Sequence, residues 1–251
     1  MRLLTLARDL KRRKAREREG LFVVEGIRAA EELLRSSLSI TGLLVAPKLV
    51  DSPRGEALVK TARARELEIA ELDEKEFRTV AETESPQGIV ALAAVPAYSL
   101  AGVGGADPMR LLLLDAVQDP GNVGTIIRTA AALGATATVA LPGTVDVWNA
   151  KVVRSAMGAH FHHPAFHASW EDVRNFLSAA SIPLWAADAG GEALPSKSPA
   201  RLALAVGNEG AGLSAPVRET AAKVVSLPIA STVESLNVAV ATGILLHELT
   251  S

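Results

Sequence analysis

Short apolar segments alternate with segments of helical periodicity through the second half of the chain, and this alternation is the strongest constraint on the fold. The first segment, 110–114, is continuously apolar after Arg110, as is typical of a strand buried on both faces of a parallel sheet. Further strands are expected at 136–141, 163–167, 182–187, 202–206 and 224–227. The order predicts an α/β fold with a mostly parallel sheet and helices on both of its faces.

A smaller α/β unit is expected before this sheet. Its pattern begins with a helix over 3–18 and continues with strands near 21–24, 43–46, 68–72 and 88–94. Glycine and proline are dense from Pro96 to Pro108, where charge is nearly absent, so we expect a linker, with a plain surface loop as the alternative. The predicted domains are 1–96 and 109–251, joined by a linker at 97–108.

The composition excludes several classes of site. The 251 residues include no cysteine, so the chain has no disulfide, no thiolate nucleophile and no Cys-ligated zinc. Histidines cluster at 160, 162, 163 and 167, but they lack the helical spacing of a metal site, and we expect no metal. No apolar run is long enough to cross a membrane and no signal peptide is evident, so we expect a cytoplasmic protein.

Positive charge is concentrated at the N-terminus. Residues 1–20 hold eight Lys or Arg side chains and three acidic ones, which makes this segment +5 and the remainder −7 within a net charge of −2. Such a segment is either a solvated helix face or a contact for the phosphates of a nucleic acid. Aromatic residues are absent from it, so stacking on bases is not indicated.

Ligands of parallel α/β sheets bind beyond the carboxyl ends of the strands, so the loops at those ends are candidate sites. In the first loop, 115–128, Pro120 makes a turn and Asn122 is expected to cap a helix over 122–133. Arg128 is the one charged residue in that helix. It cannot be left unpaired if it is buried, so it either reaches solvent or binds an anion such as a carboxylate or phosphate, and a structural ion pair is the alternative.

Two more strand ends are rich in glycine or polar residues. The loop 207–214 has the order G-x-x-G-x-G, which is not the dinucleotide fingerprint, and it contains Glu209. The third loop carries Ser235 and Asn237 and leads into 238–246, which has no charged residue and is expected to be buried on most sides. The three loops predict a pocket of backbone groups with a few polar side chains, which suits a bulky cofactor.

These loops carry three motifs that resemble those of the SpoU (TrmH) family of RNA ribose 2′-O-methyltransferases, in the SPOUT superfamily. The motifs are Asn122-x-Gly124-x-x-x-Arg128, Gly207-Asn-Glu-Gly210-x-Gly-Leu-Ser214 and Leu227-Pro-Ile-x-x-x-Val-Glu-Ser-Leu-Asn237-Val-Ala-Val-Ala. The first part of the chain, with Phe22-Val-Val-Glu-Gly26, is similar to the L30e-like substrate-binding domain often fused to this family.

The resemblance implies a deep trefoil knot, a homodimer and S-adenosylmethionine (SAM) as the cofactor. It implies cofactor binding by Gly207, Asn208, Gly210, Leu227 and Leu236, with Leu227 in place of a common isoleucine. It implies a catalytic set of Asn122, Arg128, Glu209, Ser235 and Asn237. Because a guanidinium is a very poor base, we interpret Arg128 as a clamp on a phosphate that also stabilises a developing alkoxide.

The implied reaction is methylation of a ribose 2′-hydroxyl in structured RNA, with 23S rRNA as the expected substrate. A transfer-RNA substrate is one alternative, and a non-catalytic RNA-binding module is another. An enzyme using a different adenine-containing cofactor is a third, although the dinucleotide fingerprint is absent. The lack of charge in 238–246 has two expected causes under the resemblance: threading through the knot and packing across the dimer.

Overall fold

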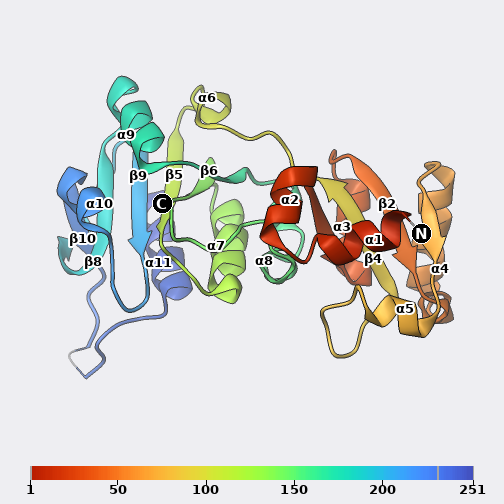
Figure 1. Ribbon diagram of the computed structural model, residues 1–251. Coiled ribbons are helices and arrows are strands. Elements are labelled where there is room, and N and C mark those ends of the chain that lie inside the picture. The colour runs from red at the N-terminus through yellow and green to blue at the C-terminus, as the bar shows by residue number, and fades with distance from the viewer. Residues whose placement is uncertain (1, 231, 251) are drawn as a thin grey trace. The chain divides into compact units, whose positions relative to one another are not determined.

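The computed structural model describes residues 2–230 and 232–250 (Figure 1). The chain divides into two compact units. Unit 1 contains the chain up to Ala97 together with Trp148–Phe161, and unit 2 contains Tyr98–Val147 and the chain from His162 onward. The sequence-based boundaries did not anticipate that residues 148–161 pack with unit 1.

Unit 1 is built on a four-stranded sheet in the order β1-β4-β2-β3. Strand β4 pairs antiparallel with β1 and β2, and β2 pairs parallel with β3. The strands are β1 (Leu21–Glu25), β2 (Ile40–Val45), β3 (Ile69–Glu71) and β4 (Ile89–Ala94). The helices are α1 (Arg2–Asp9), α2 (Arg13–Glu19), α3 (Ile27–Arg35), η1 (Pro47–Asp51), α4 (Pro53–Ala64), α5 (Glu74–Arg78), α8 (Ala150–Ser155) and η2 (Ala159–Phe161).

The single helix predicted over 3–18 is wrong, because the chain forms two helices with a break after Asp9. The buried Arg16 stabilises the break: its Nη1 donates to the carbonyl oxygens of Leu10 and Lys11, at 2.7 and 3.0 Å. These carbonyls follow the last turn of α1, where a helix leaves acceptors without intrahelical partners. The apolar face of α1 joins the core of the unit.

The returning segment 148–161 is anchored to unit 1 by aromatic contacts. The ring of Phe22 on β1 lies 4.5 Å from the ring of Trp148, centroid to centroid, and 6.2 Å from that of Phe161. Trp148 meets the His160 ring edge-on at 4.2 Å. Aromatic pairs at these separations add stability beyond the apolar area that they bury.

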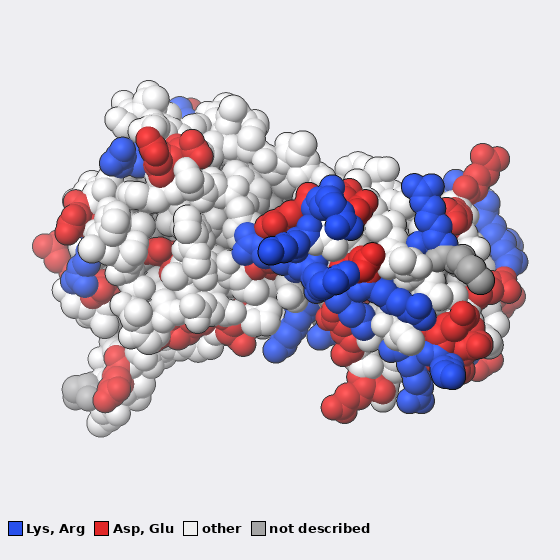
Figure 2. Space-filling model, in the orientation of Figure 1, with Lys and Arg blue, Asp and Glu red and all other residues white. Residues whose placement is uncertain are grey.

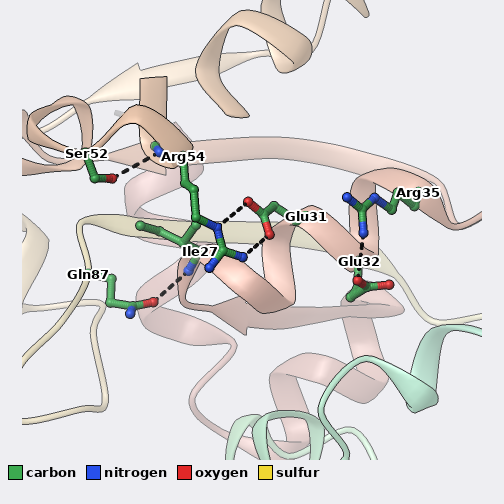
Figure 3. A network of polar contacts seen from close by, with 8 residues as sticks. Ile27, Glu31, Glu32, Arg35, Ser52, Arg54 and Gln87 are labelled. Carbon is green, nitrogen blue, oxygen red and sulfur yellow. Dashed lines mark hydrogen bonds and ion pairs between the residues drawn. The ribbon is translucent and has the colours of Figure 1, made fainter. Parts of the chain in front are cut away.

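Polar contacts fix the starts of α3 and α4 (Figure 3). The Gln87 side-chain oxygen accepts from the Ile27 amide at 2.8 Å, supplying a cap where Gly26 has no side chain to give one. Ser52 accepts from the Gly55 amide at 3.1 Å and caps α4. Arg54 makes a two-pronged ion pair with Glu31, and this hydrogen bond lowers the pKa of the Glu31 carboxyl.

Unit 2 contains a six-stranded sheet in the order β10-β8-β9-β5-β6-β7, and every neighbouring pair is parallel, as the sequence predicted. Its strands are β5 (Met109–Asp115), β6 (Ala137–Ala140), β7 (Ala165–His167), β8 (Leu184–Ala193), β9 (Arg201–Gly207) and β10 (Lys223–Ser226). Its helices are α6 (Leu100–Val103), α7 (Pro120–Ala132), α9 (Trp170–Ala179), α10 (Ala215–Thr220) and α11 (Val238–Thr250).

The expected linker belongs to unit 2 from Tyr98 onward. It contains the short helix α6, and Tyr98, Leu100 and Val103 pack against the core cluster formed by β5, β6, α9 and neighbouring elements. In α11 one side is buried at Ala239, Leu245 and Leu246. Within one chain the predicted burial on most sides is not met, because Val240 and Ile244 are 52% and 40% exposed.

Candidate functional site

A cavity of about 430 Å³ lies at the carboxyl ends of β9 and β10 in unit 2, beside the middle of β8. Its walls come from these strands, from the loop before α11 and from α11 itself. All five residues predicted to bind a cofactor line it: Gly207, Asn208, Gly210, Leu227 and Leu236. Ser231, in the same loop, lies outside the described residues.

The Gly207 loop is closed tightly at its base. The backbones of Asn208 and Gly212 exchange two hydrogen bonds of 2.9 Å each. A Cβ atom on Gly207 would lie 2.4 Å from the carbonyl carbon of Gly212, so any side chain at this position would force the loop open.

The Asn208 side chain shapes this loop from within. Its oxygen accepts from the amides of Gly210 and Ala211, each at 2.9 Å, and its NH2 group donates to the Ala116 carbonyl at 3.0 Å. Ala116 has a φ of +57°, an uncommon backbone conformation for a residue with a side chain. The side chain of Asn208 therefore organises the cavity wall and joins the exits of β5 and β9.

The polar residues of the three motifs form a hydrogen-bonded chain. Asn122 donates from its side-chain nitrogen to the Glu209 carboxylate at 2.8 Å. Its side-chain oxygen accepts from the Asn237 side chain at 3.0 Å. One amide thus links side chains that are 87 and 115 residues away in the sequence. The structure brings together three of the five predicted catalytic residues.

The helix starts next to this chain differ from the prediction. Asn122 does not cap the first helix: α7 begins at Pro120, and Asp119 caps it by accepting from the Asn122 amide at 2.7 Å. Asn237 serves α11 instead, because its side-chain oxygen accepts from the amides of Ala239 and Val240 at 2.9 and 3.3 Å. Asn122 and Asn237 are therefore oriented by helix termini as well as by each other.

The other two predicted catalytic residues stand apart from this chain. Ser235 lines the cavity and is exposed. Arg128 is exposed on α7 and does not line the cavity. Six helical residues separate it from Asn122, which turns the two side chains about 120° apart around the helix axis. In the described part of the chain, the exposed Arg128 side chain has no hydrogen-bond or ion-pair partner, so the alternative of a structural ion pair is not met and its guanidinium reaches solvent.

Sequence reasoning missed Asp188, which lines the cavity from the middle of β8. The same argument that selected the other loops would have found it, since Asp188 follows the apolar strand expected at 182–187 and precedes two glycines. It adds a third carboxylate to those of Glu209 and Glu234 on the cavity wall. The wall is therefore acidic as well as apolar, and it suits a ligand with a cationic group and a hydrophobic body.

The clustered histidines play a different part. Across residues 2–230 and 232–250, no three His, Cys, Asp or Glu side chains gather in a way that could hold a metal ion. His163 is buried, and its Nε2 lies 2.9 Å from the Thr138 hydroxyl on β6. Burial lowers the pKa of His163 to about 4, because desolvation disfavours the charged imidazolium.

The SpoU rRNA Methylase family matches residues 109–247, which contain the cavity and the hydrogen-bonded chain. The chain belongs to this family. Residues 5–91 match the MRM3-like substrate binding domain. The predicted family, with a substrate-binding domain in the first part of the chain, is therefore confirmed.

Several SpoU relatives cover nearly the whole chain. A Bacillus subtilis protein named 23S rRNA (guanosine(2553)-2′-O)-methyltransferase RlmP is 36% identical over 249 residues, covering 96% of this chain and 93% of its own. The structure of the SpoU methyltransferase AviRb from Streptomyces viridochromogenes in complex with AdoMet superposes with a TM-score of 0.90 at 29% identity, covering 99% and 96% of the two chains. An AdoMet-bound rRNA methyltransferase from Sinorhizobium meliloti superposes with a TM-score of 0.85 at 30% identity, covering 98% and 93%.

These findings confirm the predicted enzyme class, an RNA (ribose-2′-O)-methyltransferase, and SAM as its cofactor. The cavity fits this group on physical grounds. SAM carries an aromatic adenine ring and a net positive charge, and the cavity combines apolar side chains such as Val225 and Leu245 with the carboxylates of Glu209 and Glu234. Within the described ranges, no helix is both long enough and apolar enough to span a bilayer.

Proposed function

We propose that this enzyme methylates the 2′-hydroxyl of one ribose in 23S rRNA, with SAM held in the cavity of unit 2. The observation that carries the proposal is the chain Glu209–Asn122–Asn237, which joins all three motifs beside that cavity. The proposed cofactor contacts are five residues of the cavity wall: Gly207, Asn208, Gly210, Leu227 and Leu236. SAM, when bound, supplies a methyl group already activated by its sulfonium charge.

The chain's own residues then have to orient the ribose hydroxyl and stabilise the charge that develops on its oxygen. We assign the orienting role to Asn122, Asn237 and Ser235, which offer neutral donors and acceptors near the cavity. Glu209 fixes the Asn122 amide by accepting a hydrogen bond from one of its two N–H groups. Asn122 is left with one free N–H to present to the substrate.

Arg128 is proposed to hold a phosphate next to the reactive ribose. Its guanidinium is exposed and offers five donors in a planar fork that matches a phosphate. It lies on α7, which packs against α11.

The homodimer is proposed to form through the exposed side chains of Val240 and Ile244 on α11. The trefoil knot implied by the family belongs to the same proposal, as does a cytoplasmic location, where a ribosomal RNA would be met.

Unit 1 is proposed to bind the RNA through the basic surface over α1 and α2 (Figure 2). Seven of the eight N-terminal cations are exposed: Arg2, Arg8, Lys11, Arg12, Arg13, Lys14 and Arg18. The eighth, Arg16, is buried and holds the turn between the helices, so it is not available to a phosphate. Clustered exposed cations provide affinity for RNA that falls steeply with salt.

The test of this surface has to spare the fold. Deleting residues 1–18 would remove Leu3, Leu4 and Leu10 from the core of unit 1, so loss of RNA binding would then be uninformative. Replacing Arg12, Arg13 and Lys14 with Gln removes three exposed cations and the surface ion pairs of Arg12 with Asp9 and of Arg13 with Glu17, but it removes no side chain from the core. The matched control replaces three other exposed cations of unit 1, Lys60 and Arg63 on α4 and Arg65 directly after it. We expect only the first variant to bind RNA more weakly. The slope of its log affinity against log salt concentration should fall by the equivalent of about two or three phosphate contacts, and its SAM affinity should not change.

The reaction is tested by methyl transfer from labelled SAM to 23S rRNA and to transfer RNA, followed by mapping of 2′-O-methyl positions in cells with and without the protein. We expect one ribose of 23S rRNA to be modified, and Asn122→Ala to abolish the modification while the variant stays folded. Modification confined to transfer RNA would contradict the substrate. Tight SAM binding without transfer to any RNA would favour a non-catalytic module.

A further inference from the structure

Asp188 lies where the pairing of β8 with β10 is interrupted. Ala186 pairs with Val224, but the next residue of β10, Val225, pairs with Glu192, so residues 187–191 stand out from the ladder. Gly191 makes this possible, since a Cβ there would lie 2.6 Å from the Val225 carbonyl carbon. The protruding segment carries Asp188 to the cavity wall.

The Asp188 carboxylate is held on both of its oxygens. Oδ1 accepts from the Gly190 amide at 2.9 Å, and Oδ2 accepts from the Arg218 guanidinium at 2.9 Å. The Asp188 side chain is 19% exposed and that of Arg218 is 52% exposed, so the carboxylate is the more enclosed partner. A carboxylate has about four acceptor positions, and these two contacts leave the others free with the group already oriented.

The ion pair decides which donor suits this carboxylate. Because Arg218 balances its charge, Asp188 exerts less attraction on a cation than the carboxylates of Glu209 and Glu234, which have no ion-pair partner in the described part of the chain. A balanced carboxylate still accepts hydrogen bonds from neutral hydroxyls. The two adjacent hydroxyls of a ribose match two fixed oxygens, as acidic side chains do in dinucleotide sites.

We propose that Asp188 binds the ribose hydroxyls of the cofactor and that Arg218 is a positioning residue that orients Asp188 and balances its charge. The proposal rests on the assignment of this cavity to SAM. It gives the protruding segment 187–191 of β8 a role in cofactor recognition that is distinct from the roles of the three motifs.

The test uses calorimetric titration of the full-length protein with three probes. S-adenosylhomocysteine contains the whole scaffold, 5′-methylthioadenosine lacks the amino-acid end, and 2′-deoxy-5′-methylthioadenosine also lacks one ribose hydroxyl. The variant is Asp188→Asn. The matched control is Glu192→Gln, on the same strand, 78% exposed, ion-paired with Lys223 and absent from the cavity wall.

We expect the unaltered protein to prefer 5′-methylthioadenosine over its 2′-deoxy form by about tenfold or more, as for a lost hydrogen bond to a charged acceptor. Asp188→Asn should lower the affinities for S-adenosylhomocysteine and for 5′-methylthioadenosine equally, by about tenfold. It should also reduce the preference for 5′-methylthioadenosine over its 2′-deoxy form. Glu192→Gln should change neither. Arg218→Gln should lower the affinity for 5′-methylthioadenosine, because Asp188 is then less well oriented. It should also raise the preference for cationic SAM over S-adenosylhomocysteine, which has no net charge, because the negative charge of Asp188 is then unbalanced.

Three results separate the possibilities. Equal affinity of the unaltered protein for the two nucleosides overturns the proposal without any variant. If Asp188→Asn binds S-adenosylhomocysteine more weakly but binds 5′-methylthioadenosine as before, Asp188 lies at the amino-acid end of the cofactor. That result also overturns the proposal. Failure of the unaltered protein to bind S-adenosylhomocysteine contradicts the cofactor site itself, and with it the proposed function.

Discussion

Stability between pH 7.5 and pH 5 is expected to depend on His163. Burial lowers its pKa to about 4 in the folded chain, against about 6.5 for an unperturbed histidine. As the pH falls through 6.5, the unfolded state takes up a proton that the folded state does not, so stability falls with it. The stability that depends on a neutral His163 is fully present above about pH 6.5 and is lost as the pH falls from there to about 4.

The size of the effect follows from these two values. Each tenfold change in a protonation constant is worth about 1.4 kcal/mol, so the whole loss amounts to about 3 kcal/mol at the acid end. Between pH 7.5 and pH 5 it is about 2 kcal/mol. That is a substantial share of the 5–15 kcal/mol typical of a folded domain.

The measurement is urea unfolding of the unaltered protein and of His163→Gln at several values of pH from 7.5 to 5. Glutamine keeps a side-chain polar atom near the Thr138 hydroxyl and does not titrate. We expect the variant to be less stable at pH 7.5, because its packing is altered, but to lose about 2 kcal/mol less on acidification. His162→Gln is the control, since His162 is exposed and should leave the pH dependence unchanged. If His163→Gln and the unaltered protein lose stability in parallel, His163 does not stay neutral in the folded chain and the reasoning is refuted.

Three further predictions concern the site and the proposed dimer. Gly207→Ala should reduce SAM affinity at least tenfold in calorimetry, because its Cβ meets the Gly212 backbone at 2.4 Å, whereas Gly134→Ala, with open space around its Cβ, should leave affinity unchanged despite some backbone strain. Arg128→Lys should lower kcat by about tenfold or more and leave SAM affinity intact if the guanidinium forms a two-pronged contact with phosphate; retention of most of the turnover would count against that contact. Val240→Asp should shift the sedimentation of a dimer to that of a monomer, while Val50→Asp, which alters an equally exposed valine of unit 1, should not.

The sequence was most informative about residues whose place follows from the end of a predicted strand. Parallel strands have to place their carboxyl ends along one edge, so Gly207, Leu227 and Ser235 could be assigned to one pocket without knowing how the loops cross. The start of α7 could also have been found. Pro120 is favoured at the first helical position, and Asp119 before it is a good cap, so the cap at Asn122 was a misjudged choice between two suitable residues.

Other features depend on contacts between distant segments, which no local pattern records. The break between α1 and α2 has no glycine or proline in it and is held by Arg16 reaching back to Leu10. The packing of 148–161 on Phe22 cannot be distinguished by periodicity from packing on its own sheet.

Asn122 shows the same limit at the site itself. The strand pattern predicts that its loop meets the loops of Glu209 and Asn237 at one edge of the sheet, but no local pattern records the particular hydrogen bonds that join the three side chains. Once the loops meet, the chemistry is restrictive. An amide with one donor committed to a carboxylate and its oxygen committed to a second amide has a single N–H left to offer. The orientation of that group is therefore set by three segments at once, and a substitution in any one of them should misdirect the other two.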